Sequence, residues 1–160
     1  MDTIRFVLRT PQELGEDDAD ELWREDYVVQ IMINDIELVD ILRPLEIPFC
    51  EQEGAPELAG DYAHCTPRDL YWELTNELFS DDPLEKNDAE LLACAACGFS
   101  GCWSPTVQIH ADAQNVYWDH FSHNHRDWDY GLSFVFDRAQ YRQALKMLER
   151  MQVDCRRHHA

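Results

Sequence analysis

The sequence predicts an α+β fold in which helices pack on a mostly antiparallel sheet. Two observations lead to this expectation. Short apolar segments typical of strands occur both before and after a helix-like segment, and a second helix-like segment follows near the end of the chain. With 160 residues, 45% of them hydrophobic, the chain is long enough to bury one core, so we expect a single domain over residues 1–160.

The first expected elements are strands of an N-terminal hairpin. Residues 4–8, IRFVL, alternate like a half-buried strand, and residues 27–42 contain two strand-like runs that meet at Asn34 and Asp35. Both residues tolerate the left-handed conformation of a tight turn. The acidic run 13–26 fits either a short helix or a solvated loop.

The middle of the chain is expected to hold a long irregular connection and then a helix. Residues 43–66 contain three prolines and two glycines without a sustained period, which favours a loop. Thr66 directly before Pro67 is typical of a helix start, and apolar residues recur at helical spacing after it. We therefore predict a middle helix over residues 67–79.

The second half is expected to form a small meander and a C-terminal helix. Short strand-like segments cover residues 89–94, 106–111, 115–121 and 132–136. Asp137 then stands where a helix N-cap is expected, and the apolar residues of the segment 138–152 fall on one helical face.

The charge of the chain restricts its partners. The formal net charge is -19, from 32 acidic and 13 basic residues. Such a field repels nucleic acids and anionic membranes, so we expect neither as a partner, and it accelerates encounter with a basic protein.

Six of the basic residues lie after position 137. Four of these recur every four residues along the predicted C-terminal helix: Arg138, Arg142, Lys146 and Arg150. We expect this basic stripe to anchor the helix to the acidic body or to a second copy of the chain in a homodimer.

The six cysteines are expected to be reduced. No stretch approaches the roughly 20 apolar residues of a membrane span, and the N-terminal residues do not resemble a secretory signal. We therefore expect a cytoplasmic protein, and in that compartment clustered cysteines indicate metal binding, redox chemistry or plain burial.

Three of the cysteines form the main candidate site. Cys94 and Cys97 make a C-x-x-C pair followed by Gly98, and Cys102 follows Gly101. This spacing suits zinc, with a fourth ligand from His125, His120, His110 or Cys65. A second interpretation fits the same spacing equally well: the thiols are free and buried, and the glycines only shape a turn. A thioredoxin-like redox pair is disfavoured because the two glycines argue against a helix. The predicted metal ligands are Cys94, Cys97, Cys102 and His125.

The triplet His123, Asn124 and His125 spells the name of a nuclease motif, but that motif is spread over a larger unit and a protein this acidic would repel its substrate. The surrounding segment is rich in aromatic residues. We expect Trp118, Phe121, Trp128 and Tyr130 to pack in the core, with His125 and Arg126 either bracing the fold or lining a pocket.

Three segments carry a resemblance: residues 91–109, 116–131 and 134–145. They resemble an uncharacterised family of small acidic bacterial proteins with a CxCGxxGCW segment, a downstream WxxFxxxHR segment and a closing FDxxxY helix. Residues 33–43 and 55–62 are similar to its first half. The matching positions are Cys97, Gly98, Gly101, Cys102, Trp103, Trp118, Phe121, His125, Arg126, Phe136, Asp137 and Tyr141. Cys94 departs from the pattern by one extra residue. The resemblance implies a common fold and brings no activity with it.

Two functions are compatible with the sequence. The first is a non-enzymatic acidic binding module that docks a basic protein, as an immunity protein or inhibitor does. The second is a small metal- or thiol-dependent enzyme that uses the Cys94–Cys102 region and His125. The sequence contains no complete set of acid, base and nucleophile, which favours the binding module.

Overall fold

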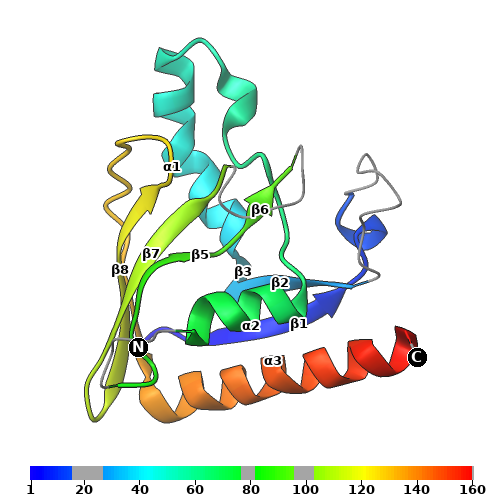
Figure 1. Cartoon of the computed structure of the whole chain (residues 1–160). Coiled ribbons are helices and arrows are strands. Elements are labelled where there is room, and N and C mark those ends of the chain that lie inside the picture. Colours follow the sequence, from blue (N-terminus) through cyan, green and yellow to red (C-terminus); the bar gives the residue numbers. More distant parts are fainter. Residues whose placement is uncertain (16–26, 77–81, 96–102, 160) are drawn as a thin grey trace.

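The computed structural model describes residues 1–15, 27–76, 82–95 and 103–159, with side chains as far as Gln152. Within them the chain has an α+β fold built on antiparallel strand pairs, as the sequence predicts. The strands form a three-stranded sheet of order β1-β2-β3, a two-stranded sheet β4-β6 and a four-stranded sheet β5-β7-β8-β9. Figure 1 shows α1 extending away from α2 and α3, which lie together near β1.

The predicted turn of the N-terminal hairpin is present, but the second of the two strands that meet there is shorter than predicted. Strand β1 (Ile4–Arg9) pairs with β2 (Val28–Ile33), and the short 3-10 helix η1 (Gln12–Leu14) follows β1. Asn34 and Asp35 turn the chain with φ angles of 53° and 63°. Consecutive positive φ angles match the twist of antiparallel strands, which is why two residues suffice for the turn. The predicted acidic segment 13–26 lies for the most part outside the described residues.

Two predictions failed after this turn: the strand up to residue 42, and an irregular connection that starts at residue 43. The second strand of the hairpin, β3 (Ile36–Glu37), has two residues, and helix α1 (Leu38–Gln52) replaces the rest of that strand and the first part of the expected loop. Pro44 and Pro48 lie inside this helix, although proline normally interrupts one. The helix forms because apolar residues four positions apart, such as Leu38 and Leu42, bury one face, and this packing outweighs the two lost backbone hydrogen bonds.

The rest of that region is short and compact. The 3-10 helix η3 (Pro56–Leu58) leads to β4 (Tyr62–Ala63), which pairs with β6 (Ala93–Cys94). The middle helix α2 (Pro67–Thr75) starts as predicted, because the Thr66 hydroxyl accepts a hydrogen bond from the backbone N–H of Asp69 at 3.1 Å. It ends four residues before the predicted boundary.

The predicted meander forms the four-stranded sheet. Its strands are β5 (Lys86–Glu90), β7 (Pro105–Ala111), β8 (Asn115–His123) and β9 (Phe134–Asp137). The segment predicted as one strand over residues 89–94 is divided between two sheets, because β5 pairs with β7 whereas β6 pairs with β4.

Helix α3 (Arg138–His159) closes the fold and extends the predicted helix. The Asp137 carboxylate accepts from the backbone N–H of Gln140 at 3.0 Å, which is the predicted N-cap. Beneath the helix, the indole N–H of Trp118 donates to the Tyr141 hydroxyl at 3.2 Å inside the core. None of the described helices is long and apolar enough to cross a membrane.

Candidate functional site

The structure places only part of the predicted thiol site. Cys94 is buried in β6, opposite Tyr62 of β4, and His125 is exposed after β8. Cys97 and Cys102 lie outside the described residues. The ligand set Cys94, Cys97, Cys102 and His125 therefore stays a prediction. No disulfide joins the three described cysteines, Cys50, Cys65 and Cys94.

The other candidates for a fourth ligand lie elsewhere. The buried Cys65 thiol faces the carbonyl oxygen of Leu91 at 3.8 Å. His110 and His120 lie beside Asp119 in a group that contains no thiol from the described part of the chain. These two histidines therefore belong to a different constellation from Cys94.

A buried carboxylate holds α1 in place. Glu46 is fully buried and accepts hydrogen bonds from the hydroxyls of Tyr62 at 2.5 Å and Tyr130 at 2.6 Å, and from the backbone N–H of Gly60 at 2.8 Å. Burial raises the pKa of both tyrosines, so their hydroxyls keep their protons and donate. Glu46 thus ties α1 to β4 and to the segment after β8.

The Cys50 thiol, one turn further along α1, is also buried. Burial, followed by the negative charge of Glu46, raises its pKa, so it remains a protonated thiol at neutral pH. A protonated, buried thiol is a poor nucleophile. The groups under α1 therefore have structural roles.

Residues after β8 also contact the C-terminal end of α1. The Arg126 guanidinium donates to Glu53 at 2.7 Å and lies 4.9 Å from the centre of the Trp103 ring. The Phe49 ring stacks on Trp128 at 5.8 Å. Arg126 braces the fold, one of the two roles expected for it, and the four predicted core aromatics are buried: Trp118, Phe121, Trp128 and Tyr130.

His123 is the buried histidine that the sequence did not single out. Its ring lies 4.0 Å from that of Trp103 and 4.9 Å from that of Trp128, with 4% of the residue exposed. Burial, helped by the nearby charges of His125 and Arg126, lowers its pKa to about 4. His123 is therefore neutral at physiological pH. The available signal was the aromatic content around the triplet, but no spacing rule identifies which histidine faces inward.

The hydrogen bonds of His123 argue against a metal on this ring. Its Nδ1 accepts from the backbone N–H of His125 at 3.1 Å, so in the neutral ring the proton is on Nε2. That Nε2 is buried and has no hydrogen-bond partner among the described residues. A metal on Nε2 would require the proton to move to Nδ1, where it would face the N–H of His125.

The opposite side of α1 faces solvent. Five residues share this side, at helical spacing, and we call them the α1 outer face: Asp40, Pro44, Ile47, Pro48 and Glu51. Ile47 is 37% exposed. Proline is tolerated here because the carbonyl groups that lose their helical partner belong to exposed residues and are open to water.

The surroundings of the α1 outer face are strongly acidic. Residues 38–61 contain six acidic residues, all exposed except Glu46, and one basic residue, Arg43. Arg43 is already paired with Asp40 at 3.0 Å. Glu51, Glu57 and Asp61 are exposed, and no ion pair joins them to the described basic residues. An exposed apolar side chain thus lies within an acidic surface.

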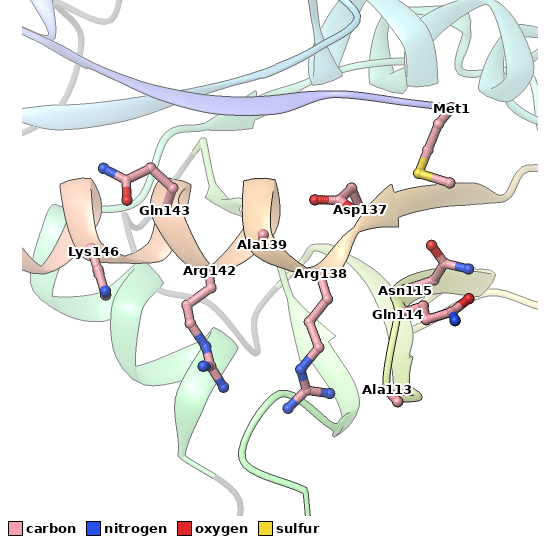
Figure 2. Close-up of a pocket in the computed structure, with 10 residues that line it drawn as sticks. All are labelled: Met1, Ala113, Gln114, Asn115, Asp137, Arg138, Ala139, Arg142, Gln143 and Lys146. Atoms are coloured by element: carbon pink, nitrogen blue, oxygen red, sulfur yellow. The ribbon is translucent and has the colours of Figure 1, made fainter.

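An open groove of about 830 Å³ lies beside the start of α3. Figure 2 shows the side chains of Arg138, Arg142 and Lys146 pointing to the same side of the helix, as the predicted basic stripe requires. Arg138 donates to both carboxylate oxygens of Asp82, at 2.8 and 3.2 Å, and to the Asp112 carbonyl. One member of the stripe thus anchors α3 to the acidic body, whereas Arg142 and Lys146 are exposed.

Comparison of the chain with protein-family models, with curated proteins and with solved structures gives no match. The resemblance of the cysteine, tryptophan and tyrosine segments to a bacterial family stays a prediction. Function must therefore be inferred from the residues themselves.

Proposed function

We propose that the protein is a non-enzymatic binding module whose α1 outer face docks a basic protein, in the manner of an inhibitor or immunity protein. One observation carries the proposal: the exposed Ile47 lies between two prolines on a helix face within an acidic surface. The partner that fits is a protein with an apolar recess surrounded by lysine and arginine side chains.

Rigidity of α1 supports this proposal. Glu46, Phe49 and Glu53 tie the helix to distant segments from behind. A surface that is already ordered before binding loses little conformational entropy on association. The net charge of -19 supplies the long-range attraction that raises the association rate with a basic partner.

The same charge supports the exclusion of nucleic acids and of anionic membranes as partners. We place the protein in the cytoplasm, where its thiols remain reduced. The alternative, a small metal- or thiol-dependent enzyme, depends on Cys97, Cys102 and His125. The binding module fits the described residues better, because Glu46 is occupied by three donors and Cys50 and Cys94 are buried.

A matched pair of charge reversals tests the proposal. Glu51→Lys and Glu149→Lys change the net charge equally and both sites are exposed on helices, but only Glu51 belongs to the α1 outer face. The probe is a synthetic amphipathic helix with a leucine face flanked by lysines, and its association is followed by surface plasmon resonance at several salt concentrations. We expect Glu51→Lys to slow association markedly more than Glu149→Lys, and salt to reduce the difference.

A third variant tests the apolar part of the surface. Ile47→Ala should mainly accelerate dissociation of the same peptide and leave the salt dependence unchanged, because it removes apolar contact area and no charge. Equal effects of the two charge reversals, together with no effect of Ile47→Ala, would show that binding is a non-specific response to net charge and would refute the proposed surface.

A further inference from the structure

Three potential metal ligands meet on the exposed side of the β7–β8 pair. His110 comes from β7, and Asp119 and His120 come from β8. One carboxylate oxygen of Asp119 lies 3.2 Å from Nε2 of His110 and 2.6 Å from Nδ1 of His120. The three ligand atoms all lie within 4.8 Å of one another.

An irregularity in the sheet brings the third ligand into this group. Thr106 pairs with Ser122, but Gln108 pairs with Asp119, so β8 contains one more residue than β7 across this interval. The extra residue forms a β-bulge, and His120 adopts a φ angle of 52° there. In a regular strand the side chains of consecutive residues point to opposite faces. The bulge allows His120 to approach the carboxylate of Asp119.

The donors suit a borderline divalent transition metal. Two imidazole nitrogens and one carboxylate oxygen are ligands that zinc and its neighbours in the first transition row accept. Ligand atoms around one tetrahedral zinc ion are about 3.3 Å apart, given metal–ligand distances of about 2.0 Å. The observed separations from Asp119, 3.2 and 2.6 Å, both lie below this value, and rotations of the exposed side chains that widen the shorter one are enough to accommodate an ion.

The site is accessible to an ion from solvent. The exposed fractions of the side chains are 46% for His110, 34% for Asp119 and 68% for His120. The strongly negative chain raises the local concentration of cations. Within the described ranges, no other group of three or more histidine, cysteine or acidic side chains has this compact arrangement.

We propose that His110, Asp119 and His120 bind one divalent transition-metal ion, with zinc as the favoured ion and water in the remaining coordination position. This ligand set shares no residue with the predicted thiol site or with the α1 outer face. Three protein ligands and a solvent-facing position are typical of sites that exchange their fourth ligand.

Calorimetric titration of the metal-free protein with zinc in a non-coordinating buffer tests the proposal. The informative variants are His110→Gln and His120→Asn, the second chosen because asparagine tolerates positive φ and should preserve the bulge. The control is Asp127→Asn, an exposed residue that belongs neither to this group nor to the predicted thiol site. We expect each informative variant to weaken binding at least about tenfold and the control to bind like the parent.

Cobalt distinguishes this site from a thiol site. Cobalt bound by two histidines and an aspartate lacks the intense thiolate-to-metal charge-transfer absorption that cysteine ligands produce, and it should broaden the NMR signals of the His110 and His120 rings in the parent protein. This second measurement needs no variant, so it remains decisive if a substitution impairs folding. Absence of zinc binding, unchanged binding in both informative variants, or cobalt that leaves the two ring signals sharp would overturn the proposal.

Discussion

The Tyr130 hydroxyl donates a buried hydrogen bond of 2.6 Å to the carboxylate of Glu46, a residue 84 positions earlier in the chain. This bond joins α1 to the segment between β8 and β9. Tyr130→Phe should lower the free energy of unfolding by about 1.5–3 kcal/mol, because a hydrogen bond to a charged buried group is lost while the ring is retained. Urea denaturation at neutral pH measures the change.

Tyr117→Phe is the matched control for this bond. The Tyr117 hydroxyl donates to Asp112 at 2.8 Å in an exposed setting. We expect its loss to cost clearly less than the loss of the Tyr130 hydroxyl. Equal destabilisation by the two substitutions would contradict the anchoring role assigned to Glu46.

Stability should decrease in mildly acidic solution because of His123. Its folded pKa is about 4, whereas an unfolded histidine titrates near 6.5. Between these values the unfolded state binds more protons, so folding becomes less favourable as the pH falls through this window. Lowering the pH from 7 to 5 should remove about 2 kcal/mol through this residue.

Comparing denaturation curves at the two pH values isolates this contribution. His123→Gln should have a smaller pH dependence than the parent, because the substitution removes the group whose pKa differs between the folded and unfolded states. A His123→Gln protein that lost as much stability as the parent between pH 7 and pH 5 would assign the effect to other groups.

Arg138 should matter more for stability than its neighbours in the basic stripe. Its hydrogen bonds to Asp82 lower the pKa of that carboxyl group and connect α3 to the segment before β5. Arg138→Gln should reduce the melting temperature by a few degrees, and less at high salt. Arg150→Gln, on the exposed side of the same helix, is the control and should melt like the parent.

The rest of the stripe tests for a homodimer. Arg142 and Lys146 are exposed beside the groove in Figure 2. If a second copy binds there through its acidic residues, replacing both by glutamate should convert dimers to monomers in sedimentation experiments at low salt. If the parent and the double variant sediment identically, these two residues form no dimer contact and are simply exposed to solvent.

The predicted thiol site has its own test. If Cys94, Cys97, Cys102 and His125 hold zinc, the purified protein should contain close to one zinc ion, and chelation should lower its melting temperature. Cys97→Ser and Cys102→Ser should remove this zinc, whereas His120→Asn should not. A zinc-free parent whose melting temperature is unaffected by chelators would favour the alternative of simple buried thiols.

Local signals in the sequence were sufficient for most of the elements. The turn at Asn34 and Asp35, the caps at Thr66 and Asp137, and the strands of the meander each depend on neighbouring residues and backbone preferences. Helix α1 was missed for a physical reason. Its prolines are strong local signals against a helix, whereas the burial of its inner face depends on contacts with residues far along the chain.

The sequence by itself determined the fold class, the acidic character and the identity of the residues able to bind a metal. Only the tertiary structure decided which of them meet. Glu46 contacts Tyr62 and Tyr130 because distant segments pack together in the core. His110, Asp119 and His120 lie close together because a bulge changes the pairing of two strands. Sequence spacing does not predict these contacts, because each of them depends on strand register and burial, and long-range packing determines both.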